Sequence, residues 1–142
     1  VDISAAAVSL ARENAAAHGV AERTQFTEGD LLDPFAAEPV FDVIVSNPPY
    51  VRSDELEQLQ ADVRLYEPRL ALDGGADGLD IVRRILRQAP DRLASGGWLL
   101  LEVAPEQMSL VERAAEESGS LLKTSVVKDL GGDSRVWIGQ RP

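Results

Sequence analysis

The chain has 142 residues, 44% of them hydrophobic, which is enough for a folded core and excludes a disordered chain. A formal net charge of −10 argues against a protein that clamps nucleic-acid phosphates, because that affinity comes from clustered Lys and Arg. With no cysteine, a single histidine and no long apolar run, neither a disulfide, a metal cluster nor a membrane span is expected. We expect one cytoplasmic domain over residues 1–142.

The N-terminal segment predicts a strand end followed by a helix. Val1-Asp2-Ile3 reads as the last residues of a buried strand that has been cut into, so we expect a domain fragment. Ser4 is a favourable N-cap, and the helix formers after it predict a helix over Ala5–Ala17. The helix should end at His18-Gly19, where glycine can adopt a left-handed conformation.

Two strands are predicted next. The β-formers of residues 23–27 predict a short strand that ends in the turn Glu28-Gly29-Asp30, and residues 31–40 read as loop. The apolar run Phe41–Val45 has the length and composition of a central parallel strand. It leads directly into the motif Ser46-Asn47-Pro48-Pro49-Tyr50.

The rest of the chain alternates helical and strand patterns. A glycine-rich loop is expected over Asp73–Gly78, a turn over Ser95–Gly97 and a hairpin turn over Asp129–Asp133. The remaining expected elements are helices over 54–63, 79–89 and 105–118, and strands over 98–103, 121–127 and 134–140. Alternating strands and helices predict a doubly wound α/β fold, in which an open parallel sheet is completed by a C-terminal antiparallel hairpin.

Polar residues follow three of the predicted strand ends. Ligands of such sheets bind outside the carboxyl ends of the strands, where Asp2, Asp30 and Asn47 fall. An acid at such an end can accept hydrogen bonds from ribose hydroxyls. Taken alone, however, Asp2 also fits a helix N-terminal acid, and Asp30 an ordinary turn residue.

The chemistry of Asn47-Pro48-Pro49-Tyr50 is more specific. The prolines fix their own backbone angles, restrict the residue before each of them and supply carbonyl oxygens without N–H donors. Asn47 adds a side-chain acceptor and donor, and Tyr50 an aromatic wall. Such a loop suits a substrate NH2 group, because oxygens that hold its hydrogens orient the nitrogen towards an electrophile. The alternative is a rigid loop that merely ends a strand.

Several stretches together resemble the S-adenosylmethionine-dependent methyltransferases of the HemK/PrmC type. They are VDIS, GDLL, FDVIVSNPPYV, YEPRLALDGG, DGLDIVRRIL and GGWLLLEV. This family methylates the side-chain amide of the glutamine in the GGQ motif of peptide chain release factors. The resemblance therefore implies a Rossmann-like class I methyltransferase sheet, S-adenosylmethionine as cofactor and release factors as protein substrates, with an effect on translation termination.

The resemblance also implies roles for individual residues in the cofactor site. Asp2 matches the acid that binds the cofactor ribose, and Asp30 with Leu31 matches the segment that flanks its adenine. The family's glycine-rich loop follows a strand that would precede Val1, so the first central strand is expected to be missing. A fragment of this kind is expected to bind cofactor weakly and to expose strand edges.

In the substrate site, Asn47 would accept from the glutamine NH2 through its side chain and Pro48 through its carbonyl. Pro49 completes the rigid loop, Tyr50 would pack against the target side chain, and Asn47 also borders the cofactor. Glu67 and Arg69 lie in a block typical of this family, but a surface ion pair is the simpler interpretation of each.

Two other interpretations stay open. NPPY also occurs in methyltransferases that act on adenine in DNA or guanine in rRNA, where Tyr50 would stack on a flipped base. The net charge of −10 argues against nucleic acid as the direct substrate. The second alternative is an inactive fragment that cannot bind cofactor.

Overall fold

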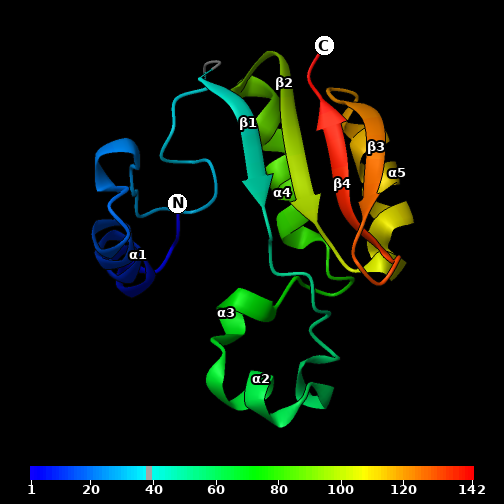
Figure 1. Ribbon diagram of the computed structural model, residues 1–142. Coiled ribbons are helices and arrows are strands. Elements are labelled where there is room, and N and C mark those ends of the chain that lie inside the picture. The colour runs from blue at the N-terminus through cyan, green and yellow to red at the C-terminus, as the bar shows by residue number, and fades with distance from the viewer. Residues whose placement is uncertain (38–39) are drawn as a thin grey trace. The chain divides into compact units, whose positions relative to one another are not determined.

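The computed structural model describes residues 1–37 and 40–142 (Figure 1), and the chain forms two compact units, Val1–Ala37 and Glu38–Pro142. The helices are α1 (Ala5–Ala17), α2 (Ala61–Tyr66), α3 (Arg69–Leu72), α4 (Asp80–Gln88) and α5 (Met108–Ser118), and the strands are β1 (Phe41–Ser46), β2 (Leu93–Glu102), β3 (Leu122–Lys128) and β4 (Ser134–Gln140). None of the helices in the described ranges combines the length and apolar character needed to cross a bilayer.

Helix α1 of the first unit confirms the prediction made from its caps. The Ser4 hydroxyl accepts a 3.3 Å hydrogen bond from the Ala7 amide, which satisfies a free N–H of the first turn. The helix ends at Ala17, His18 is its C-cap, and Gly19 follows with a φ of +65°. Val8 and Ala15 are its buried residues.

The two short strands predicted in the first unit are not formed. Asp2 and Glu28 make only an isolated parallel bridge, in which the Asp2 amide donates to the Thr27 carbonyl at 3.2 Å. Val1 is 56% exposed, so the expectation of a buried strand there is wrong. Arg23 ends a 3₁₀ turn, and the Thr24 hydroxyl donates back to the Val20 carbonyl at 2.7 Å, which favours the turn over an extended strand. The loop predicted over 31–40 includes residues 38 and 39, which lie outside the described residues.

The second unit contains a four-stranded sheet with the strand order β1-β2-β4-β3 (Figure 1). β1 and β2 are parallel, and the other two neighbouring pairs are antiparallel, so the predicted parallel pair and C-terminal hairpin are confirmed. β1 pairs only with β2 among the described residues and therefore lies at the sheet edge. The central position expected for Phe41–Val45 is not observed in this sheet.

The core of the second unit lies between the sheet and helices α4 and α5, which pack on the same face (Figure 1). Side chains with no exposed surface come from both layers and include Leu79, Val82, Leu93, Leu99, Leu101, Val111 and Trp137. Leu99 and Leu101 alternate along β2, as expected for a strand with one face on helices. On β1, Ile44 is buried whereas Val43 and Val45 are 50% and 71% exposed. The opposite face of β1 is therefore open in this unit.

Two predicted boundaries are wrong. The turn expected at Ser95–Gly97 lies inside β2, which begins at Leu93. Phe41 pairs with Leu93 and Val43 with Trp98, so β2 bulges between these pairs, and Gly96 has a φ of +77°. The helix expected over 54–63 is divided into a 3₁₀ turn, Leu56–Gln58, and α2, because Gln60 has an extended ψ of 145°.

Candidate functional site

The Asn47–Tyr50 motif leaves the carboxyl end of β1. Ser46, the last residue of β1, pairs with Leu101 near the end of the parallel strand β2, so both strands end at one edge of the sheet. Ligands of parallel α/β sheets bind at this edge. Asn47 is exposed there, Pro48 is buried, and Pro49 and Tyr50 are half-buried. The motif thus combines a buried proline with an exposed amide side chain.

The glycine-rich loop Asp73–Gly78 holds the chain just after the motif. Val51 donates a 2.9 Å hydrogen bond to the Leu72 carbonyl and accepts a 2.8 Å bond from the Gly74 amide. Val51 and Asp73 thereby form a parallel bridge. The glycine-rich loop expected from the sequence is therefore a backbone partner of the motif.

Two glycines allow this loop to approach the motif closely. A Cβ atom on Gly74 would lie 2.8 Å from the Pro49 carbonyl oxygen. A Cβ atom on Gly78 would overlap both the Tyr50 carbonyl oxygen and the Gln107 amide nitrogen, and Gly78 has a φ of +77°. A side chain at either position would displace the carbonyls of the motif.

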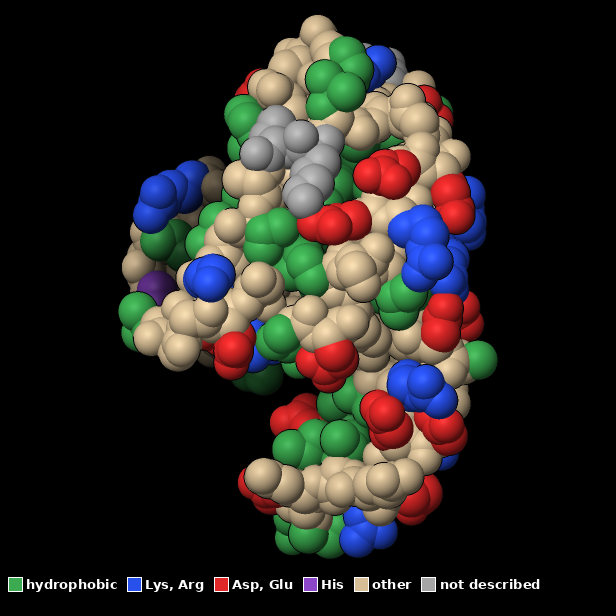
Figure 2. Space-filling view, turned by 90° about the vertical axis from the view of Figure 1, so that its right-hand side faces the viewer, with side chains coloured by type: hydrophobic (Ala, Val, Ile, Leu, Met, Phe, Trp, Pro, Cys, Tyr) green, Lys and Arg blue, Asp and Glu red, His purple; other side chains and the backbone are tan. Residues whose placement is uncertain are grey.

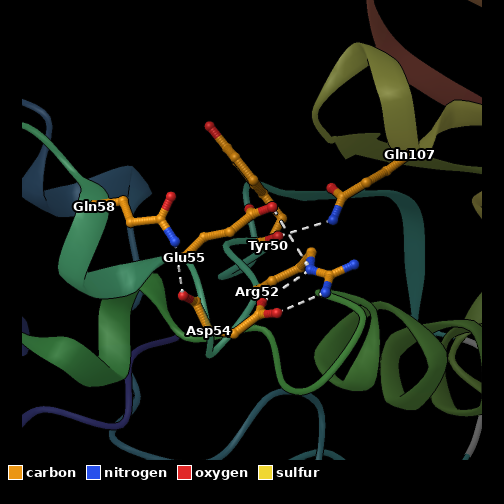
Figure 3. Close-up of polar contacts among 6 residues, drawn as sticks. All are labelled: Tyr50, Arg52, Asp54, Glu55, Gln58 and Gln107. Atoms are coloured by element: carbon orange, nitrogen blue, oxygen red, sulfur yellow. Dashed lines mark hydrogen bonds and ion pairs between the residues drawn. The ribbon is translucent and has the colours of Figure 1, made fainter.

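Gln107 contacts the motif from the segment that follows β2. It ends the 3₁₀ turn Pro105–Gln107, which follows β2, and its Nε2 donates a 2.8 Å hydrogen bond to the Tyr50 carbonyl (Figure 3). Gln107 is only 6% exposed, and its Oε1 atom has no hydrogen-bond partner among the described residues. Sequence reasoning missed Gln107, because its contact with the motif depends on the parallel pairing of β1 with β2.

Two aspartates order the loop through charge-assisted hydrogen bonds. The Asp73 carboxylate accepts from the Ser53 hydroxyl at 2.6 Å and from the Gly75 amide at 3.0 Å, and these bonds hold the pKa of Asp73 below the ordinary value of 3.8. The Arg83 guanidinium donates to both Asp77 oxygens, at 2.9 and 2.5 Å, and lowers the pKa of Asp77. Both carboxylates are thus stabilised in the charged form.

Acid is expected to weaken this loop. Because the pKa of Asp73 is lower in the folded state, the unfolded state binds more protons, and stability rises with pH across this window. The contribution is present above about pH 4 and is lost as the pH falls through the folded pKa. In Asp73→Asn, the free energy of unfolding should fall less steeply between about pH 4 and pH 2, as measured by urea unfolding at several pH values. Parallel pH curves for the two proteins would contradict this.

The insert between the motif and the loop, residues 51–72, carries mixed surface charges (Figure 2, lower lobe). Arg52 pairs with Asp54 at 2.7 Å and Glu55 at 3.6 Å, and all three side chains are about half exposed or more (Figure 3). Arg69 pairs with Asp73 at 3.4 Å. The observed pair agrees with the ion-pair interpretation of Arg69. Pairs of this kind contribute little to stability. Glu67 lines a small pocket with Arg64 and Leu72 among others.

The predicted cofactor residues belong to the first unit. The Asp2 Oδ1 atom accepts a 2.8 Å hydrogen bond from the Ser4 amide, as in the helix-terminal alternative, while the side chain stays exposed. The Gly29 amide donates to the Asp2 carbonyl at 3.0 Å, so the turn that carries Asp30 lies beside Asp2. Leu31 has a φ of +50°, an uncommon conformation for leucine. Asp2, Asp30 and Leu31 therefore form one group in the first unit. Asn47–Tyr50 and Gln107 form a separate group in the second unit.

Comparison with known proteins finds similarity to methyltransferases. Residues 1–68 match the family model of the methyltransferase small domain. The chain is 47% identical to a release factor glutamine methyltransferase of Cereibacter sphaeroides over 99% of the chain and 50% of that protein. It is 49% identical to the protein of the same name from Geobacter sulfurreducens over 99% of the chain and 48% of that protein. The chain thus spans about half the length of these relatives.

Solved structures show the same fold. TrmN from Thermus thermophilus superimposes with a TM-score of 0.66 at 23% identity, over 99% of this chain and 35% of that one. The E. cuniculi Mtq2-Trm112 complex, described as responsible for methylation of the termination factor eRF1, gives a TM-score of 0.55 at 25% identity, over 91% of this chain and 68% of that one. The expectation of a class I methyltransferase fold is confirmed.

Proposed function

We propose that the protein to which this chain belongs is a release factor glutamine methyltransferase. The chain is homologous to such enzymes over nearly all of its length. A methyl group passes from S-adenosylmethionine to the side-chain amide nitrogen of the glutamine in the GGQ motif of a peptide chain release factor. The observation that carries the proposal is the exposed Asn47 amide at the carboxyl edge of β1, on a loop braced by Gly74, Gly78 and Gln107. A cytoplasmic location follows, since translation takes place there.

Within the proposed site, Asn47 and Pro48 hold the substrate amide. The Asn47 side-chain oxygen accepts one hydrogen of the NH2 group, and the Pro48 carbonyl accepts the other. Held in this way, the nitrogen presents its lone pair in one direction, and both oxygens stabilise the positive charge that develops there. Tyr50 packs against the rest of the glutamine side chain. After the methyl group has arrived, the nitrogen releases its extra proton to solvent water.

The cofactor site is proposed at Asp2, Asp30 and Leu31. Asp2 fits a ribose, because within the described residues its exposed carboxylate accepts a hydrogen bond only through Oδ1, from the Ser4 amide, so that Oδ2 can accept from a hydroxyl. Asp30 and Leu31 follow on the turn beside Asp2 and would flank the adenine. S-adenosylmethionine, when bound, supplies an electrophilic methyl group.

Methyl transfer from labelled S-adenosylmethionine tests the function. Because the chain spans about half the length of its relatives, the full-length product of its gene is assayed beside the chain itself. A release factor and a variant whose GGQ glutamine is replaced by alanine form the first pair of substrates, and DNA and rRNA form the second. We expect label in the release factor and none in its alanine variant. Label in nucleic acid alone, or in no substrate of the full-length protein, would contradict the proposal.

A further inference from the structure

The peptide group between Tyr50 and Val51 is held at both of its ends. Its carbonyl oxygen accepts the 2.8 Å bond from Gln107 Nε2, and its N–H donates the 2.9 Å bond to the Leu72 carbonyl. Because a peptide group is planar, these two bonds fix the rotation of the chain directly behind Tyr50. On the N-terminal side, the prolines Pro48 and Pro49 restrict the same loop through their rings.

Gln107 has little freedom to move away from this contact. The residue is 6% exposed, and the close approach of Gly78 leaves no room for even a methyl group beside Nε2. The Gln107 amide points at the backbone of Tyr50, whereas the Tyr50 ring points away from it (Figure 3). The contact therefore acts on the backbone of the motif and leaves the ring available to a substrate.

Burial of the Gln107 side-chain amide is energetically unfavourable. Its Oε1 atom is enclosed without a hydrogen-bond partner among the described residues, and such an atom destabilises a fold. An apolar residue of the same length, such as methionine, would fill this space without that penalty. The amide is thus explained by the bond that Nε2 makes, not by packing.

We infer that Gln107 is a positioning residue, which fixes the Tyr50–Val51 peptide group and thereby the orientation of the Asn47–Tyr50 loop. This inference rests on the proposed function for its effect on catalysis, but the geometric part stands apart from it. Gln107 ties the loop after β1 to the connection after β2, across 57 residues of sequence. Its hydrogen bond goes to the backbone of Tyr50 and not to the Asn47 side chain or the Pro48 carbonyl.

Hydrogen exchange and kinetics of Gln107→Met test the inference. Loss of one backbone-directed hydrogen bond should raise the exchange rates of the Val51 and Gly74 amides about 3- to 10-fold, while the amides of Leu99 and Leu101 in β2 stay unchanged. In the full-length protein, kcat for methyl transfer should fall about 10- to 100-fold with an unchanged KM for S-adenosylmethionine. Gln107→Asn retains the amide but is one methylene too short, and it should give the same pattern.

Gln140→Met is the matched control, because Gln140 Nε2 also donates to a backbone carbonyl, that of Gly96, at 2.9 Å in the same unit. It should leave the Val51 and Gly74 exchange rates unchanged. Wild-type exchange in both Gln107 variants, or faster exchange that extends equally to β2, would overturn the inference. If the wild-type protein transfers no methyl group, the proposed function fails, and the exchange rates still decide the role of Gln107.

Discussion

Asn47→Ala is expected to lower the rate of methyl transfer about 100- to 1,000-fold. The variant removes the exposed amide at the carboxyl edge of β1, and loss of one positioned hydrogen-bonding group in an active site typically has an effect of this size. The Kd for S-adenosylmethionine should change little, because the proposed ribose acid is Asp2. Single-turnover assays with a release factor and calorimetric titration with S-adenosylmethionine, both on the full-length protein, measure the two quantities.

Asn14→Ala is a suitable control, since it removes another exposed asparagine amide, on helix α1. It should retain wild-type turnover. Asn47→Ala is also expected to fold normally, because the Asn47 side chain lies exposed, directly after the last residue of β1. Turnover within threefold of wild type in Asn47→Ala would refute the role assigned to this side chain.

Local signals made parts of the fold predictable. Helix α1 was predictable because Ser4 and Gly19 act within a few residues of the helix that they cap. The bulge at Ser95–Gly97 was not predictable, since glycines usually end a strand and only pairing with β1 carries β2 through them. The strand expected over 23–27 failed for the opposite reason: local β-formers without a paired neighbour did not form a ladder.

The candidate site likewise contains residues that could be predicted from the sequence and residues that could not. The motif Asn47–Tyr50 was predictable from adjacent residues, because the effects of proline on the backbone are local. Gln107 was not, since its contact depends on the parallel pairing of β1 with β2. Gly78 was expected only as a loop residue, and its close approach to Tyr50 is visible only in three dimensions. Residues that support a motif from other elements are thus the ones that sequence reasoning misses.

Gly78→Ala is expected to destabilise the second unit by about 2–5 kcal/mol. A non-glycine residue in the left-handed region destabilises by about 1–2 kcal/mol, and Gly78 has a φ of +77°. Its new methyl group would also overlap the Tyr50 carbonyl oxygen and the Gln107 amide nitrogen, and forcing extra volume into a packed site adds about 1–3 kcal/mol. Urea unfolding with a constant m-value measures the change.

Gly119→Ala separates these two effects. Gly119 follows α5 with a φ of +64°, and an added Cβ would meet no atom of the described residues within 4 Å. This variant keeps the left-handed strain without the overlap, and the change in unfolded-state entropy from glycine to alanine is the same in both. Gly119→Ala should therefore destabilise by only about 1–2 kcal/mol. Equal losses in the two variants would show that close packing of Gly78 on the Tyr50 carbonyl contributes nothing, whereas a larger loss in Gly78→Ala measures how tightly the loop holds the motif.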